Sequence, residues 1–551
     1  MRRLAIRLVL GGVLSFLAAC SSTPNPLPPP SLSSVQPNSG STAGGTAVTI
    51  AGANFQVGAS VHFGSVPATG VTVNSAASIS AVTPAGAAGA VDVTVTNPDS
   101  QSAVLPSGFR YLAPCLLPST VTSNMTLDDS CIWTVAATVT VGGPSNPVLT
   151  ILAGTTVEFA PSTGGNNGAA LRVGADGQPG SLVANGTSAS GILLTSESLS
   201  PAPGDWGGVL IGPMGGGTSM EYVTIDYAGG AGGNDLPNAD AAGLTVEGGD
   251  VSSGSASQTP APLVSYVTVH NSAGHGLVFA GLDTGFGPNS GYISVMNWEL
   301  TEHFPLVIEA NEGGTVPTTI SATPSTSASA VVAIQTFVNQ FCAVEASTTW
   351  PAIPLPYFIE TTVQVISSGP TGPDDTLTIA APNTVEFASG TELDVDPPPA
   401  GANSQSNGNS YLVAAGSPGN SITFTSGAAS PGLGDWAGLN FWCTNANQST
   451  GSSLSYATIE WAAAVKNSGP TGTGEIAIGD GQQTANGPLG PVIANCSFLN
   501  YGTATSDYGI ALFDVSNVSL SNYLSANNTF ATAYQAIQYC SGQITDGTCN
   551  P

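Results

Sequence analysis

The sequence has few charged residues and very few cations. Charged residues make up 7% of its 551 positions, and 6 Lys and Arg stand against 34 Asp and Glu, which gives a formal net charge of −28. A nucleic-acid partner needs Lys and Arg side chains that displace counterions from the phosphates. The composition therefore excludes a nucleic-acid partner, and for the same reason it disfavours anionic polysaccharides.

The residue patterns of several kinds of site are missing as well. The sequence has no Cys-x-x-Cys pair and no Cys/His cluster, and its histidines are scattered at His62, His270, His275 and His303. We therefore predict no metal site and no cofactor. A G-x-S-x-G nucleophile elbow and an H-E-x-x-H helix are also absent.

The abundant residues indicate an ordered protein rich in turns. The chain has 69 Gly and 41 Pro, yet 41% of its residues are hydrophobic, and the apolar residues alternate with Ser, Thr and Asn over short runs. Alternation of this kind between turn residues is typical of β-strands. We expect an all-β protein that is long enough for two or three domains.

The N-terminus has the features of an export signal. Positive charge is followed by an apolar stretch that ends in small residues, and the stretch is shorter than the roughly 20 apolar residues of a transmembrane helix. The sequence LAAC at Leu17–Cys20 resembles a bacterial lipobox. The resemblance implies that residues 1–20 hold a lipoprotein signal and that Cys20 carries the lipid. The alternative is an ordinary signal peptide with an incidental cysteine.

The residues after the signal predict a tether. Residues 21–31, SSTPNPLPPPS, are rich in Pro and Ser and favour an extended chain. Ser21, in the second mature position, is compatible with the outer membrane. We expect an exported protein that is attached by its lipid to the outer membrane or the cell surface of a bacterium. Without the three signal arginines, three cations remain against 34 acids, a formal charge of −31.

The other cysteines fit an oxidising compartment. Pairing of neighbours gives Cys115–Cys131 and Cys540–Cys549, Cys443–Cys496 is a further option, and Cys342 is left over. Sequence alone does not fix this connectivity.

Residues 32–112 form the first predicted domain. Short alternating runs separated by Pro, Gly and Asn turns are typical of a β-sandwich. The stretch resembles the IPT/TIG family of immunoglobulin-like domains, and the matching residues are Pro37, Gly40, Gly44, Gly45, Thr46, Val48, Ile50, Gly52, Asn54, Phe55, Val61, Phe63, Gly64, Pro84, Val91, Val93, Val95, Asn97, Pro98, Phe109 and Tyr111. The resemblance implies a spacer or an interaction module without chemistry of its own.

The rest of the chain contains an internal sequence repeat. The run TVEFAPS at Thr156 returns as TVEFASG at Thr384, and SMEYVTIDYAG at Ser219 returns as SLSYATIEWAA at Ser453. An internal repeat of this length predicts two related halves. We place them at residues 113–341 and 342–551.

Each half consists of short strand-like runs without two-residue hairpin turns, which argues against local antiparallel pairing. The order of these runs resembles the parallel β-helix of the pectate-lyase-like superfamily. In such a solenoid, inward residues stack from coil to coil and outward positions are free to be polar. The resemblance also implies a catalytic Arg or Lys, but the repeated region offers only Arg172 and Lys466, at positions that are not equivalent.

One motif occurs in both halves, as GDWGGV from Gly204 and GDWAGL from Gly434. The sequence favours a structural corner, in which Trp206 and Trp436 cover the coil stack and the preceding aspartates accept backbone N–H groups. The alternative makes Asp205 and Asp435 acids or bases in glycoside cleavage, paired with Asp226 and Glu460. Glycosidases need two carboxylates roughly 5–9 Å apart.

The remaining candidates are binding features. Trp298, Trp350, Trp442 and Trp461 are candidates to line a sugar-binding face, because aromatic rings stack on apolar sugar surfaces, although most aromatics in a β protein lie in its core. The segments Gly229–Gly243 and Asp374–Thr378 offer oxygen atoms suited to Ca²⁺. Neither has the spacing of a calcium motif, so we predict loops.

Together these patterns predict an immunoglobulin-like sandwich followed by a duplicated β-helix on a lipid anchor. The function that they favour is non-catalytic adhesion or binding of a carbohydrate or surface-protein ligand. A polysaccharide lyase or glycoside hydrolase is the first alternative, and it predicts converging carboxylates in only one half. A structural component of the envelope is the second.

Overall fold

The computed structural model describes residues 27–162, 168–230, 241–248, 261–281, 284–298, 303–324, 330–336, 342–367, 374–397, 410–442, 451–462, 474–479, 491–500, 508–513, 527–530, 537–540, 544–545 and 548–549. The chain forms two compact units, Met1–Ala113 and Pro114–Pro551. Cys20, Cys443 and Lys466 lie outside the described residues. Within the described part, no helix has the length and apolar character needed to cross a bilayer.

The first unit is a sandwich of two sheets. One is antiparallel, in the order β1 (Ser31–Gln36), β3 (Ala47–Ala53), β7 (Ser78–Val82) and β6 (Thr69–Ser75). The other has the order β2 (Ser39–Ser41), β9 (Ser102–Leu112), β8 (Gly89–Thr96), β4 (Ser60–Phe63) and β5 (Val66–Pro67), in which only β2 and β9 run parallel. Ile50, Ile79 and Phe109 are fully buried between them. The predicted immunoglobulin-like sandwich is confirmed.

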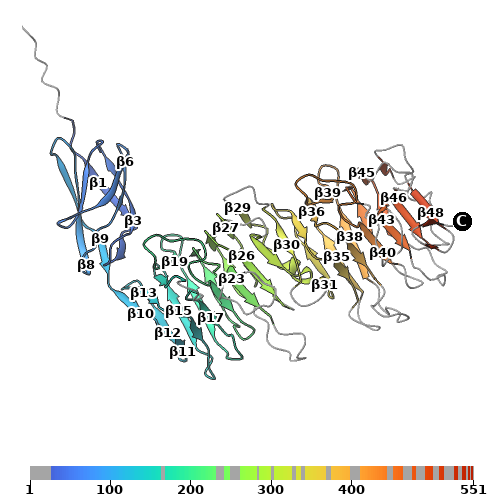
Figure 1. Ribbon diagram of the computed structural model, residues 1–551, viewed down its shortest axis with the longest axis horizontal. Coiled ribbons are helices and arrows are strands. Elements are labelled where there is room, and N and C mark those ends of the chain that lie inside the picture. Colours follow the sequence, from blue (N-terminus) through green and yellow to red (C-terminus); the bar gives the residue numbers. More distant parts are fainter. Residues whose placement is uncertain are drawn as a thin grey trace, which may run out of the picture. The chain divides into compact units, whose positions relative to one another are not determined.

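The second unit is a parallel β-helix whose strands stack in rows (Figure 1). The long sheet runs through both halves with the strands β11 (Thr120–Val121), β14 (Val139–Val141), β17 (Leu171–Val173), β20 (Val209–Ile211), β23 (Ala242–Glu247), β26 (His275–Ala280), β28 (Leu306–Ile308), β30 (Val332–Ile334), β33 (Tyr357–Ile359), β36 (Asn383–Phe387), β39 (Ile422–Ser426), β42 (Ala457–Glu460), β45 (Ser497–Leu499) and β47 (Thr529–Phe530).

Two further sheets belong to the first half. Sheet A1 has the order β10 (Pro114–Leu116), β13 (Ile132–Val135), β16 (Thr156–Phe159), β19 (Ile192–Ser196), β22 (Val223–Asp226), β25 (Thr268–His270), β27 (Ser294–Met296) and β29 (Ser321–Thr323). Sheet A2 has the order β12 (Met125–Leu127), β15 (Val148–Leu152), β18 (Ser181–Asn185), β21 (Ser219–Glu221) and β24 (Leu263–Ser265).

The second half has its own pair of sheets. Sheet B1 has the order β32 (Thr348–Trp350), β35 (Asp375–Ile379), β38 (Ser410–Ala415), β41 (Ser453–Ser455) and β44 (Val492–Ala494). Sheet B2 has the order β31 (Cys342–Val344), β34 (Val363–Val365), β37 (Leu393–Val395), β40 (Leu439–Trp442), β43 (Gly474–Gly479), β46 (Tyr508–Phe513) and β48 (Ile537–Cys540). β49 (Ile544–Thr545) and β50 (Thr548–Cys549) form a short antiparallel pair.

Stacking in register builds one continuous core. Val157 of β16 pairs with Leu194 of β19, which pairs with Ile225 of β22, and all three are buried. Alternate residues of each strand point inward, so that every coil places its apolar side chains on those of the next coil. The predicted alternation of inward apolar and outward polar residues is confirmed along these strands, and with it the all-β class with a parallel β-helix.

The two halves enter the β-helix one strand out of step. β16, which holds TVEF, lies in sheet A1, but its counterpart β36 lies in the long sheet. In the same way β17 of the long sheet corresponds to β37 of sheet B2, and β18 of sheet A2 corresponds to β38 of sheet B1. In Figure 1, β19 and β27 of sheet A1 and β36 and β39 of the long sheet run along the same upper side.

The halves join between the last strand of sheet A1 and the first strand of sheet B2. Sheet A2 ends at β24 and sheet A1 at β29, whereas sheet B2 begins at β31. Between them a 3-10 helix, η2 (Ala310–Thr315), follows β28 at the point of the coil where earlier coils place a strand of sheet A2. The Trp350 indole donates a hydrogen bond of 2.9 Å to the Ala310 carbonyl and fixes this helix against the second half.

The cysteines follow the prediction in part. Cys115 of β10 and Cys131, the residue directly before β13, form a disulfide. Cys342 and Cys496 are buried free thiols, so the option of a Cys443–Cys496 disulfide is wrong. The reason is packing: Cys496 lies in the core cluster of the β-helix, in contact with apolar side chains. The side chains of Cys540 and Cys549 lie outside what the structure describes.

Candidate functional site

The repeated GDW motif forms a corner of the coil in each half. Trp206 stacks on Phe159 and Trp436 stacks on Phe387, in both cases with ring centroids 3.9 Å apart. Both indoles are fully buried. The indole of Trp206 donates to the carbonyl of Asp226 at 2.8 Å, and the second corner repeats this bond to the Glu460 carbonyl at 3.0 Å. Each tryptophan thus closes the core where the chain turns.

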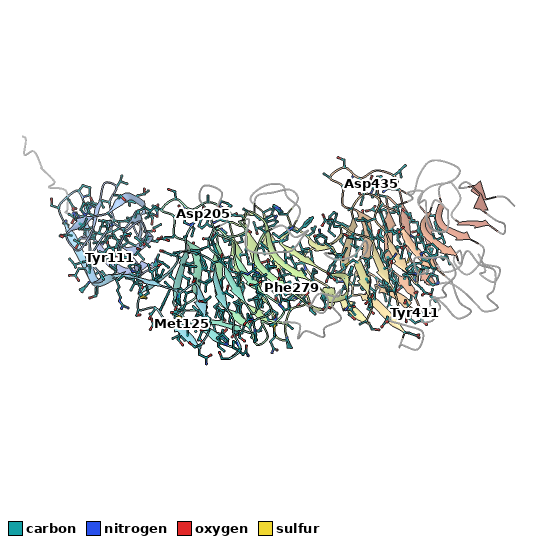
Figure 2. The ribbon with its side chains drawn as sticks, turned by 60° about the horizontal axis from the view of Figure 1, so that its bottom comes forward. Tyr111, Met125, Asp205, Phe279, Tyr411 and Asp435 are labelled. Atoms are coloured by element: carbon teal, nitrogen blue, oxygen red, sulfur yellow. A yellow bond between two sulfur atoms is a disulfide. The ribbon has the colours of Figure 1, made fainter. Side chains whose placement is uncertain are left out.

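The aspartates of the motif hold the corner loops. The Oδ2 of Asp205 accepts hydrogen bonds from the Ser196 hydroxyl at 2.6 Å and from the Ala202 N–H at 3.2 Å. The Oδ2 of Asp435 accepts the equivalent bonds from Ser426 and Gly432, both at 2.7 Å. Figure 2 shows both aspartates in loops along the upper edge of the view. These contacts are those of the structural corner that the sequence favours.

The proposed partners of these aspartates lie on outward rows. In sheet A1, Asp226 follows Glu158 and Thr195 along one row, and its Oδ1 lies 3.4 Å from the Nδ1 of His270. Burial raises the pKa of Asp226, although hydrogen bonding from Asn271 and the charge of His270 lower it. Burial raises the pKa of Glu158 to about 7, and the negative charge of Glu197 makes a smaller contribution in the same direction.

The second half repeats this row without its histidine. Glu386, Thr425 and Glu460 lie on neighbouring strands of the long sheet. The Thr425 hydroxyl donates to Glu460 at 3.1 Å, and burial raises the pKa of Glu386. The row pattern is thus shared by the two halves, and it does not distinguish one half from the other.

A second group of polar residues occurs in only one half. We call it the polar face: outward residues on sheet B2 or directly before its strands, namely Gln364, Glu392, Asp394, Asn440, Trp442 and Glu475. Gln364, Asp394 and Asn440 form one row across three strands. The next residue along this row is Ala477, which is buried beside Asn440. The polar face therefore combines carboxylates and amides with the small side chain of Ala477.

One amide ties two of the carboxylates together. The Nδ2 of Asn440 donates to the Oε2 of Glu392 at 2.8 Å and to the Oδ1 of Asp394 at 2.9 Å. Gln364 donates to the other oxygen of Asp394 at 3.3 Å. Burial raises the pKa of Asp394 to about 6, although the amides of Asn440 and Gln364 and the nearby Trp442 indole lower it.

Glu475 lies on the same side of sheet B2, across Gly438 from Glu392. Ile476 pairs with Leu439, which pairs with Leu393. The residues that precede these three, Glu475, Gly438 and Glu392, therefore form one row across the sheet. Glu475 is 0% exposed, and neither of its carboxylate oxygens has a hydrogen-bond partner. Burial raises the pKa of Glu475 well above the ordinary value, and the negative charge of Glu460 makes a smaller contribution in the same direction.

Trp442 lies at the opposite end of the polar face and is partly exposed. Its indole N–H is buried but completes no hydrogen bond. Buried polar atoms are nearly always paired in native proteins, so an unpaired carboxylate on this surface calls for an explanation. Glu475 therefore offers acceptors that no described residue uses, whereas the Trp442 indole lies close enough to Asp394 to lower the pKa of that carboxyl.

The equivalent surface of the first half has different chemistry. Glu392, Asp394, Asn440, Trp442 and Glu475 correspond to Ala170, Arg172, Leu210, Gly212 and Gly243 on the long sheet. At these outward positions acidic side chains therefore occur in the second half, at residues other than Asp435 and Glu460. The difference is visible in the sequence when the two halves are compared. LRV at Leu171–Val173 becomes LDV at Leu393–Val395, and VLI at Val209–Ile211 becomes LNF at Leu439–Phe441.

The other predicted site residues lie apart from the polar face. Trp298 and Trp350 are fully buried, and each indole donates to a backbone carbonyl. Trp461 follows β42 at a corner with a φ of 66°. His275 is buried, and its Nδ1 accepts the Phe304 N–H at 2.8 Å. Arg172 pairs with Asp176 at 3.1 Å.

The two candidate calcium segments differ in outcome. Most of Gly229–Gly243 lies outside the described residues. The prediction of a loop at Asp374–Thr378 is wrong, because β35 begins at Asp375 and its apolar residues Leu377 and Ile379 point into the core. The described part of the chain contains no group of three His, Cys, Asp or Glu side chains placed to hold a metal ion.

Comparison with known families agrees with this architecture. Residues 30–111 match the family model of the IPT/TIG domain. Residues 119–219 match that of the pectate-lyase like beta helix domain. The chain combines an IPT/TIG domain with a pectate-lyase-like β-helix. No curated protein gave a match to the chain. The polar face lies beyond the matched part of this β-helix, in the second half.

The corner contacts predict the effect of removing an aspartate. Asp205→Ala leaves the Ser196 hydroxyl and the Ala202 N–H without their acceptor, so we expect a loss of about 1–3 kcal/mol in the free energy of unfolding. Asp435→Ala has a similar effect, and Trp206→Ala costs about 3–5 kcal/mol because it empties a buried ring site. Urea unfolding measures these losses. Variants as stable as the wild type would contradict the structural role of the corner.

The buried Asp394 predicts a dependence of stability on pH. Its pKa is about 6 in the folded chain against an ordinary value of 3.8. Between these values the folded state binds more protons than the unfolded state, so stability falls as pH rises from about 4 to 6. Asp394→Asn removes this fall. We expect the variant to gain about 1–3 kcal/mol relative to the wild type over this range.

The control for this measurement is Asp129→Asn, at an exposed acid of the first half. This variant loses one negative charge, as Asp394→Asn does. Its free energy of unfolding should equal that of the wild type at every pH. If the Asp394→Asn curve also runs parallel to that of the wild type, Asp394 does not carry the pH dependence.

Proposed function

We propose that the protein is a lipid-anchored surface protein that binds carbohydrate through the polar face of its second half. The observation that supports the proposal is the unpaired carboxylate of Glu475 on the face that also holds Trp442. Both oxygens of this carboxylate lack a donor, and a sugar offers hydroxyl groups that donate hydrogen bonds.

The composition of the face supports the same class of ligand. Sugar sites combine an aromatic ring with a few directed polar groups. Here Trp442 is the partly exposed ring, and Asn440 and Asp394 are the directed groups beside it. The excess of acids over cations in the chain disfavours an anionic polysaccharide. We therefore infer a neutral or cationic glycan.

The chain's order fits display at a surface. The lipid on Cys20 and the tether at residues 21–31 belong to this proposal, and both lie largely outside the described residues. The IPT/TIG domain then serves as a spacer before the β-helix. The Cys115–Cys131 disulfide supports an oxidising, extracytoplasmic location.

Binding should depend on the polar face and on no other aromatic surface. The full-length chain in detergent is tested on an array of neutral and amino glycans, and the strongest ligand is titrated by calorimetry. Trp442→Ala and Asn440→Leu, which installs the residue of the first half, should weaken binding by about tenfold or more, the equivalent of about 1.4 kcal/mol.

The matched control is Tyr292→Ala, which removes a 57% exposed tyrosine from the first half. Its affinity should equal that of the wild type. A wild-type chain that retains no glycan, or a Trp442→Ala variant with unchanged affinity, would refute the proposed function.

One observation favours a catalytic alternative. Because Asn440 contacts both Glu392 and Asp394, these two carboxylates lie close to each other in the second half only. Glycosidases place two carboxylates about 5–9.5 Å apart on either side of the bond that they cleave. The same array ligands are therefore assayed for new reducing ends. Hydrolysis that is lost in Asp394→Asn would replace the binding function with this one.

The lipid anchor has its own test. Cells that express the full-length chain are fed an alkyne-bearing fatty acid, and the protein is expected to take up the label and to sediment with membranes. Cys20→Ser should abolish the labelling, because the thiol is the site of attachment. Label that persists in Cys20→Ser would place the lipid elsewhere, and an unlabelled wild type would favour an ordinary signal peptide.

A further inference from the structure

We propose that three stacked tyrosines of the first half, Tyr222, Tyr266 and Tyr292, form an oxidative cross-linking site. We call these residues the tyrosine ladder. At this site a one-electron oxidant, a haem peroxidase that uses hydrogen peroxide, joins two neighbouring rings by a carbon–carbon bond. The inference is independent of ligand binding at the polar face. It rests on the stacking of the rings, on their exposure and on the backbone conformation that they require.

The rings of the tyrosine ladder lie parallel and in contact. The ring centroids of Tyr222 and Tyr266 are 4.3 Å apart at an angle of 4°, and those of Tyr266 and Tyr292 are 4.4 Å apart at 5°. The three residues precede β22, β25 and β27 of sheet A1 at the same register position. The Tyr222 N–H donates to the Ser265 carbonyl, and the Tyr266 N–H donates to the Gly291 carbonyl. The backbone therefore holds the rings one strand apart, a spacing of about 4.8 Å.

The fold does not require tyrosine at these corners. The three members of the ladder have φ values of 51°, 52° and 54°, in a region that favours Gly and Asn over bulky residues. In the second half the equivalent positions hold Tyr456, Asn495 and Asn527, and the Asn527 amide donates to the Asn495 side chain at 3.4 Å. Two asparagines thus close the same corner in a conformation that they tolerate well. Tyrosine in three successive coils is a local cost, and such costs cluster at functional sites.

The phenol groups are accessible to an oxidant and lie beside one another. Tyr266 is 40% exposed and Tyr292 is 57% exposed. Partial burial raises the pKa of Tyr266, and the phenols of Tyr222 and Tyr292 raise it further through charge and hydrogen bonding. The hydroxyl groups of adjacent rings are therefore close to each other, and Tyr266 is protonated at neutral pH. A protonated phenol is oxidised when it loses an electron together with its proton.

The cross-linking reaction balances with hydrogen peroxide as the oxidant. Each of two adjacent phenols loses one electron and one proton, and hydrogen peroxide takes up both pairs and becomes two molecules of water. The unpaired electron of a phenoxyl radical is shared between its oxygen and its ortho carbons, so two stacked radicals couple at facing ortho carbons. The ortho hydrogens then move to the oxygens and restore both phenols.

The position of the ladder decides which bond forms. Because the rings are held in contact, coupling within one chain is favoured over coupling between chains. Tyr266 contacts both of the other rings, so the new bond joins it to Tyr222 or to Tyr292. Either bond links two successive coils covalently at β24, where sheet A2 ends.

The test treats the full-length chain in detergent with a haem peroxidase and hydrogen peroxide, followed by digestion with pepsin and mass spectrometry. We expect a peptide that contains Tyr266 to be joined to one that contains Tyr222 or Tyr292. Its mass should lie two hydrogen atoms below the sum of the separate peptides, and the product should show the blue fluorescence of dityrosine. On a denaturing gel the treated protein should remain a single chain.

Variants assign the cross-link to the tyrosine ladder. Tyr266→Phe keeps a stacked ring without a phenol, and Tyr266→Asn installs the residue of the second half. Each should reduce the dityrosine fluorescence at least tenfold. Tyr456→Asn makes the same exchange at the equivalent corner of the second half, so it is the matched control and should leave the yield unchanged. Thermal unfolding verifies that each variant is folded before yields are compared.

The inference is overturned if the treated wild type forms no dityrosine. It is also overturned if the cross-links join only separate chains or only other tyrosines, or if the yield is the same in Tyr266→Phe as in the wild type. None of these results bears on glycan binding, because Tyr292→Ala is expected to bind glycan as the wild type does.

Discussion

The in-register stacking of parallel coils is the constraint on which the rest of this protein depends. Each coil must place an apolar residue on the one before it, as Leu194 does on Val157, and each turn must be closed without a gap. The buried Trp206 and Trp436 close equivalent turns in the two halves. Because the inward positions carry the stability, the outward positions are left free to differ.

The duplication uses this freedom in a specific way. Corners and core strands are nearly the same in both halves, whereas the outward surface of sheet B2 has acquired acids, an amide and a tryptophan where the first half has Ala170, Leu210 and glycines. Structure is therefore shared between the halves, and the proposed ligand site belongs to one of them. The acids of the corners are occupied with loop hydrogen bonds, and those of the polar face are not all used.

Much of the fold could be predicted from the sequence, because strand alternation and repeated turns report local structure. The TVEF strands and the two corners lie where their patterns indicate. The shift of one strand between the halves could not be predicted, since the residue pattern of a strand does not reveal which sheet of the β-helix it joins. The polar face was missed because its members lie on separate strands, and only the register of β37, β40 and β43 brings Asp394, Asn440 and Glu475 together.

The measurement that tests the central claim most directly is a crystal structure of the protein with a bound oligosaccharide. The account predicts sugar density along the outer side of sheet B2, in contact with Trp442 and with a donor within hydrogen-bonding distance of Glu475. Sugar seated instead at the Asp205 or Asp435 corner, or over the Leu210 surface of the first half, with Glu475 still unpaired, would contradict it.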